Sequence, residues 1–168
     1  MRMAIYYGST TGNTERVAKL IQNELAGKGD VDLYDVADLN DAKAMLYYDL
    51  LLWGASTWDD GQLQYDWEAF DKHLNEIDLS GKTVAIFGLG DQEGYSDEFV
   101  DGMKILYDKA RGLGAKLVGQ WLDAGYNYSA SRAVTAGYFC GLALDEDSQP
   151  HLTEQRVTHW CEQLLSEI

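Results

Sequence analysis

The sequence has few of the residues that bind polyanions, cross a membrane or build a disulfide framework. Its 168 residues contain 13 Lys and Arg against 28 Asp and Glu, which gives a formal net charge of −15. Such an acidic chain repels nucleic acid and anionic membranes, so we expect neither as a partner. No apolar run approaches the ~18 residues of a membrane-spanning helix. No signal peptide precedes the first predicted strand, so a cytoplasmic protein is expected.

Cysteine, histidine and proline are also scarce. Cys140 and Cys161 lie far apart in sequence, and free buried thiols are the default for such a pair. His73, His151 and His159 have no metal-ligand spacing, so no metal site is expected and we predict surface or helix-end positions. With a single proline, no repeat and no linker-like segment, the length predicts one domain over residues 1–168.

Apolar runs and amphipathic runs alternate along the chain, which predicts a parallel sheet with helices on both faces. The strands are expected at residues 3–7, 31–34, 50–55, 83–87 and from 116, and the helices at 14–25, 41–48, 65–74, 98–111 and 153–168, the last capped by Thr153. The fold class is α/β, a doubly wound five-stranded parallel sheet of order 2-1-3-4-5. Residues 120–141 break the alternation, with no helical or strand period.

The loop after the first strand, Gly8-Ser9-Thr10-Thr11-Gly12-Asn13-Thr14-Glu15, has the composition of a phosphate site. Glycines let several N–H groups converge, and the helix that follows adds partial positive charge at its N-terminus. The loop contains no Lys or Arg and matches neither the Walker pattern nor G-x-G-x-x-G. A single phosphate monoester fits such a loop better than a triphosphate or a pyrophosphate; a helix-capping turn without a ligand is the alternative.

Two further loops follow central strands and reach the same edge of the predicted sheet. Ser56–Gly61 carries Trp58, and Gly88–Tyr95 ends on Tyr95. Two aromatic side chains beside one crevice can form a slot for a planar ring, although each could instead pack under its own loop. Trp53, Trp67, Trp121 and Trp160 are more consistent with core or insertion packing. Asp145 and Asp147 are expected in a solvated loop, with an approach to the edge of the bound ring as the alternative.

A phosphate loop beside an aromatic slot suits flavin mononucleotide, and four motifs resemble the flavodoxin family over nearly the whole chain. They are the 8–15 loop, Thr57-Trp58, the 90–95 segment with Gly90-Asp91-Gln92 and Gly94-Tyr95, and Gly141–Gln149. Residues 121–140 resemble the insertion in the last strand of the long-chain branch. Ser56 stands where many members of the family have proline.

The resemblance implies a set of FMN-binding residues. Ser9 to Thr14 would hold the phosphate, Trp58 and Tyr95 would cover the inner and outer faces of the ring, the backbone of Gly90, Asp91 and Glu98 would meet its pyrimidine edge, and the Asp59 carbonyl would face N5. The full set is Ser9, Thr10, Thr11, Gly12, Asn13, Thr14, Ser56, Thr57, Trp58, Asp59, Asp60, Gly61, Gly88, Leu89, Gly90, Asp91, Tyr95 and Glu98.

The resemblance also implies the activity: a monomeric low-potential electron carrier without a substrate of its own. It would shuttle between the neutral semiquinone and the anionic hydroquinone and pass electrons from a basic reductase, such as a flavodoxin/ferredoxin-NADP reductase, to acceptor enzymes. A rotated peptide between Asp59 and Asp60 would then require positive φ at Asp60. The acidic faces near Asp66–Asp71 and Asp97–Asp101 would dock such partners or serve only solubility.

Other functions are possible on the same strand order. A flavin-dependent quinone reductase would need an open nicotinamide site and usually an oligomer. A response-regulator receiver needs acids after the first strand and an Asp ending the third, where this chain has Tyr6-Tyr7-Gly8 and Gly54-Ala55-Ser56. A low-molecular-weight tyrosine phosphatase needs Cys and Arg in the first loop, and neither is there.

Overall fold

The three central strands of the main sheet are apolar along both faces because helices cover both faces. In the computed structural model, which describes residues 1–168, five parallel strands follow the order β2-β1-β3-β5-β10, which confirms the predicted topology. Their bounds are β1 Arg2–Tyr7, β2 Asp30–Asp35, β3 Leu50–Trp58, β5 Thr83–Leu89 and β10 Leu142–Leu144. A short β4, Gln62–Leu63, pairs antiparallel with the end of β3 and was not predicted.

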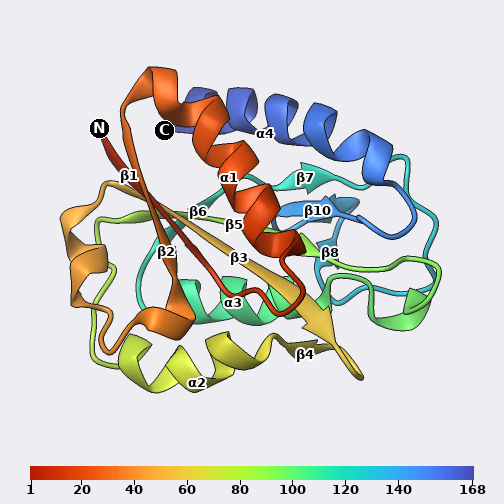
Figure 1. Cartoon of the computed structure of the whole chain (residues 1–168), viewed down its shortest axis with the longest axis horizontal. Coiled ribbons are helices and arrows are strands. Elements are labelled where there is room, and N and C mark those ends of the chain that lie inside the picture. Colours follow the sequence, from red (N-terminus) through yellow and green to blue (C-terminus); the bar gives the residue numbers. More distant parts are fainter.

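Two helices lie on each face of the sheet (Figure 1). α1 (Asn13–Leu25) and α4 (Thr153–Glu167) cover the face that contains Ile5 and Leu52, and α2 (Tyr65–Leu74) and α3 (Asp101–Gly112) cover the face that contains Tyr6 and Trp53. Successive residues of β1 therefore belong to opposite cores, as the alternation of side chains along a strand requires.

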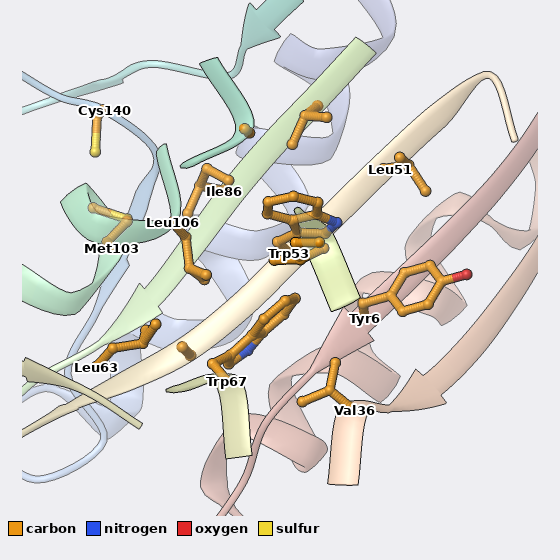
Figure 2. Packing of buried hydrophobic residues seen from close by; sticks show 14 of the residues in the cluster. Tyr6, Val36, Leu51, Trp53, Leu63, Trp67, Ile86, Met103, Leu106 and Cys140 are labelled. Carbon is orange, nitrogen blue, oxygen red and sulfur yellow. The ribbon is translucent and has the colours of Figure 1, made fainter. Parts of the chain in front are cut away.

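The core under α2 is built around two tryptophans (Figure 2). Trp53 and Trp67 are fully buried, with ring centroids 5.4 Å apart, and the Trp67 indole N–H donates to the Gly54 carbonyl at 2.8 Å. Trp160, a residue of α4, is fully buried against the sheet, and Trp121 is half-buried in the inserted segment. The predicted packing of these four tryptophan side chains is therefore confirmed. Cys140 and Cys161 are free and buried, as expected.

The fifth strand of the sheet is interrupted, as the sequence predicts. β6 (Lys116–Val118) pairs with the start of β5, and β10 pairs with its end. The residues between them form a small antiparallel sheet of order β7-β9-β8, with β7 at Trp121–Leu122, β8 at Val134–Thr135 and β9 at Tyr138–Phe139. The expectation of an irregular 120–141 segment was wrong here, because two-residue strands are too short to show a period in sequence.

Three predicted helix boundaries differ from the structure. α3 begins at Asp101 instead of residue 98, because Val100 adopts a left-handed conformation (φ 51) that interrupts the helical path. Residues 41–48 form only a 3₁₀ turn at Lys43–Tyr47. Thr153 is the first residue of α4 rather than its cap, since a 3₁₀ turn at Pro150–Leu152 leads into the helix. Further 3₁₀ turns lie at Ala26–Lys28, Val36–Asp38 and Ser96–Glu98.

No helix of the chain combines the length and the apolarity that a membrane span requires.

Candidate functional site

A cleft of about 430 Å³ lies at the carboxyl ends of the parallel strands, where ligands bind in doubly wound sheets. The loops after β1, β3, β5 and β10 supply its walls. The lining residues are Thr11, Asn13, Thr14, Ser56, Thr57, Trp58, Asp59, Leu89, Gly90, Asp91, Tyr95, Glu98, Glu146 and Asp147.

The loop after β1 turns sharply into α1 and directs the helix N-terminus at the cleft. Gly12 has φ 93, a left-handed conformation that glycine adopts without a steric cost, and it caps α1. The Ser9 hydroxyl oxygen accepts from the backbone N–H groups of Gly12 at 3.1 Å and Glu15 at 3.4 Å. The loop is therefore held in shape by Ser9, while Thr11, Asn13 and Thr14 line the cleft.

A buried glutamine supports this loop from below. Gln64 is fully buried, donates from Nε2 to the Thr10 hydroxyl at 3.1 Å and accepts at Oε1 from the N–H groups of Asp66 and Trp67 in the first turn of α2. A Cβ at Gly8 would lie 2.1 Å from Gln64 Oε1, so only glycine allows this close approach. No local sequence signal identifies Gln64, because the contact joins segments 54 residues apart.

The two aromatic residues expected at the slot both line the cleft and are both exposed. Trp58 is 38% exposed and Tyr95 is 58% exposed, although large aromatic rings are usually more deeply buried. The Trp58 indole N–H donates to the Ser56 hydroxyl at 2.7 Å, which fixes the ring on the 56–61 loop. The alternative in which each ring packs under its own loop is therefore wrong.

The 56–61 loop is anchored to the start of α3. The Gly102 N–H donates to the Thr57 hydroxyl at 2.8 Å, and a Cβ at Gly61 would meet the buried Asp101 carboxylate. Asp59 and Gly61 have positive φ, at 47 and 86, and Asp60 does not. The expected rotation of the peptide between Asp59 and Asp60 would therefore shift the left-handed conformation from Asp59 to Asp60.

The 88–95 loop is fixed by backbone contacts. The Gly90 N–H donates to the Leu144 carbonyl at 3.0 Å, and the Tyr95 N–H donates to the Asp91 carbonyl at 2.9 Å. The Asp91 carboxylate accepts from the N–H groups of Glu93 and Gly94 within the turn. These bonds hold Gly90, Asp91 and Tyr95 along one wall of the cleft.

The electrostatic character of the cleft is acidic. Asp59, Asp91, Glu98, Glu146 and Asp147 line it, and no Lys or Arg does. The nearest turn of α1 carries Arg16, but its guanidinium pairs with Glu146, which also accepts from the Thr153 hydroxyl. Burial, reinforced by the neighbouring carboxylates, raises the pKa of Asp147 above its ordinary value.

Most of the predicted site residues meet at the cleft, and six do not line it: Ser9, Thr10, Gly12, Asp60, Gly61 and Gly88. Ser9, Thr10 and Gly12 shape the first loop instead. Glu146 and Asp147 line the cleft although neither is in the predicted set; Asp147 was expected in a solvated loop. The expected solvation of Asp145 was wrong, since this carboxylate is completely buried.

The Asp91, Asp145 and Asp147 carboxylates approach one another within 4.8 Å. The two oxygens of Asp145 already accept from Gln92 N and Nε2, Asp147 N and Ser148 N, so they are satisfied without an ion. This cluster is therefore explained by hydrogen bonding within the chain.

The fold and the cleft together define a doubly wound α/β protein whose ligand site combines a cation-free glycine loop with two exposed aromatic rings. The sequence model of the flavodoxin family matches residues 5–160. The chain belongs to the flavodoxin family.

Individual relatives agree along nearly the whole length. The chain is 50% identical over 165 residues to a flavodoxin of Synechocystis sp., covering 97% of this chain and 95% of that protein. It is 45% identical over 165 residues to flavodoxin 1 of Escherichia coli, covering 98% and 93%. Among solved structures, Fusobacterium nucleatum flavodoxin bound to flavin mononucleotide superimposes with a TM-score of 0.92 at 32% identity, covering 99% of this chain and 98% of that chain.

Proposed function

We propose that this chain binds one FMN non-covalently in the cleft and carries single electrons between other proteins. The observation that carries the proposal is the cleft itself: a loop of hydroxyl and N–H donors without any cation lies at one end, and Trp58 and Tyr95 lie exposed on its other walls. The family membership and the FMN-bound Fusobacterium relative support it. We also propose that residues 1–168 act as one flavodoxin-like domain and a monomer.

The residues present suit a phosphate monoester attached to a planar ring. The N–H groups at the start of α1 and the side chains of Thr11, Asn13 and Thr14 would hold the phosphate through the helix dipole and neutral donors. Trp58 and Tyr95 would cover the ring, and Gly90, Asp91 and Glu98 would meet its polar edge. We propose that Ser9, Thr10, Gly12, Ser56, Thr57, Asp59, Asp60, Gly61, Gly88 and Leu89 complete the set, several of them by shaping the loops.

Bound FMN would supply the redox chemistry, and the chain would set its energetics. Each carboxylate about 10 Å from the ring opposes a negative charge placed there by roughly 0.4 to 1.7 kcal/mol for an effective dielectric constant between ~80 and ~20. Of the five acids that line the cleft, Glu146 is paired with Arg16; the other four would therefore favour release of the electron to an acceptor. No nucleophile with its base is required, so we assign electron transfer rather than enzymatic catalysis.

Flavodoxins act through redox partner proteins, and we propose that those of this chain present basic surfaces. The supporting observation is a run of exposed or half-exposed acids that begins at the cleft with Asp59 and continues through Asp60 into α2, at Asp66, Glu68 and Asp71, the last of them paired with Lys109. The second predicted acidic face is smaller than expected because Asp101 is buried. A flavodoxin/ferredoxin-NADP reductase is the proposed donor. We further propose a cytoplasmic location, which the free thiols of Cys140 and Cys161 support.

The decisive experiment is an absorbance spectrum of the purified protein, followed by titration with dithionite. We expect a flavin spectrum, one FMN released per chain on denaturation, and two resolved one-electron reduction steps. A colourless protein that does not bind added FMN would overturn the proposal. Steady-state oxidation of NAD(P)H with a quinone by the purified protein alone would favour the quinone-reductase alternative.

A further inference from the structure

Gln92 is a buried residue in the second half of the 88–95 loop. Its side chain is 3% exposed, whereas Glu93, Gly94 and Tyr95, which follow it, are all exposed. Gln92 does not line the cleft, although Asp91 and Tyr95 on either side of it do. A buried amide at this position must satisfy its donors and acceptor within the protein.

The partner of Gln92 is a carboxylate that is buried without a cation. Asp145 is completely buried, and its Oδ2 accepts from Gln92 N at 3.0 Å and from Gln92 Nε2 at 2.8 Å. Its Oδ1 accepts from the N–H groups of Asp147 at 3.0 Å and Ser148 at 2.8 Å. Asp145 takes part in none of the salt bridges of the chain. Four neutral donors therefore compensate the burial of this charge.

The remaining polar atom of Gln92 reaches the inserted segment. Gln92 Oε1 accepts from the Asn127 N–H at 2.6 Å. One side chain thus joins three segments that are distant in sequence: the 88–95 loop, residues 121–140 and the loop after β10. A buried polar network in which every member is satisfied favours one arrangement over its alternatives, because any other leaves a buried group unpaired.

We propose that Gln92 and Asp145 are positioning residues for the ring end of the cleft. The pair fixes the loop on which Gly90, Asp91 and Tyr95 meet the ring, and it acts independently of the loop after β1 that holds the phosphate. The inference rests on the proposed function, since the ring it positions is that of FMN. It extends beyond that function because neither residue lines the cleft.

The test is Gln92→Glu, which keeps the shape and the acceptor toward Asn127 but replaces the Nε2 donor with an oxygen facing Asp145. The matched control is Gln120→Glu, the same change at an exposed position beside the last turns of α4. Apoprotein of each is titrated with FMN, and both the dissociation constant and the fluorescence of the bound flavin are measured. Loss of a hydrogen bond to a buried charge raises the dissociation constant about tenfold or more. We therefore expect that loss, with higher fluorescence of the bound FMN, for Gln92→Glu, and a change within about twofold for Gln120→Glu.

A rescue experiment separates positioning from general destabilisation. In the Gln92→Glu, Asp145→Asn double variant the side-chain donor and acceptor are exchanged and the net charge is that of the original chain. The backbone N–H of residue 92 loses its acceptor, so the rescue is partial. We expect it to recover about fivefold of the lost affinity and the quenching of the bound flavin. If Gln92→Glu does not fold, judged by circular dichroism, Gln92→Met removes both the donor to Asp145 and the acceptor from Asn127 without adding charge, and the same loss of quenching is expected.

The outcomes distinguish this proposal from the function on which it rests. A folded Gln92→Glu or Gln92→Met variant with unchanged affinity and quenching would overturn the positioning role while leaving FMN binding intact. Asp145→Asn is also measured alone; a double variant whose loss equals the product of the losses of Gln92→Glu and Asp145→Asn would overturn the pairing of Gln92 with Asp145. Failure of the original chain to bind FMN would overturn the proposed function itself, and the positioning role with it.

Discussion

The indole N–H of Trp58 donates a hydrogen bond to the Ser56 hydroxyl at 2.7 Å, so the ring on the 56–61 loop is oriented by the residue two positions before it. Replacing Ser56 with alanine removes the acceptor and leaves the rest of the loop unchanged. A neutral hydrogen bond is worth about 0.5–1.5 kcal/mol, so we expect the FMN dissociation constant to rise about two- to tenfold. Ser80→Ala, a control that also removes a hydroxyl hydrogen bond but lies in the turn preceding β5, should leave it unchanged. Equal values for the two variants would contradict the orienting role.

Thr14 and Tyr95 line different ends of the cleft and can be separated with two ligands. Thr14→Val keeps the volume of this buried side chain but removes its hydroxyl, and we expect weaker binding of FMN by about tenfold with little effect on riboflavin, which lacks the phosphate. Tyr95→Ala should weaken both ligands, because it removes the ring contact. Dissociation constants from fluorescence quenching test the assignment. If neither change alters FMN binding, the cleft is not the flavin site.

The turn between β8 and β9 carries an alanine in a conformation that alanine disfavours. Ala136 and Gly137 link the paired residues Thr135 and Tyr138, and both have positive φ, at 53 and 83. A two-residue hairpin loop of this kind favours Asn-Gly, so Ala136→Asn should raise the free energy of unfolding by about 0.5–1 kcal/mol. Urea denaturation measures the change. Ala136→Val at the same exposed position should lower stability, and a gain in that variant would contradict the explanation.

Tyr126 predicts a loss of stability at high pH. Burial raises its pKa to about 12, although the Arg156 guanidinium, 4.1 Å from the ring centroid, acts in the opposite direction. Unfolded tyrosine titrates near ~10, so above that pH the unfolded state loses its proton first. The stabilisation is complete below pH ~10 and declines by about 1.4 kcal/mol per unit as the pH approaches 12.

The measurement is urea denaturation of the original chain and of Tyr126→Phe from pH ~9 to ~11.5. At the lower pH, Tyr126→Phe should be less stable, because the hydroxyl donates to the Ala143 carbonyl at 2.6 Å and accepts from Trp121 at 3.0 Å. The difference should shrink as the pH rises. Tyr47→Phe, at an exposed position, provides the control. A difference that stays constant with pH would contradict the prediction.

The order of the main strands and three of the four loops that line the cleft could be predicted from the sequence. Continuous apolar runs such as Leu50–Ala55 identify strands buried on both faces, and the carboxyl ends of parallel strands meet at one edge. Local sequence did not indicate where α3 begins, because the left-handed Val100 packs against Gly90, a residue of another loop. The short strands β7, β8 and β9 were missed for a similar reason: their pairing depends on contacts with distant residues and not on a period.

The sequence by itself determined the chemistry available to the cleft: a hydroxyl-rich loop without cations, two aromatic rings and many carboxylates. Only the tertiary structure decided which of these groups reach the ligand and which hold the walls in place. Gln64, Gln92 and Asp145 are polar residues, a type usually exposed to solvent, yet all three are buried. They are buried because the fold brings hydrogen-bonding partners to them from segments more than fifty residues away, and a buried polar group persists only where such partners exist.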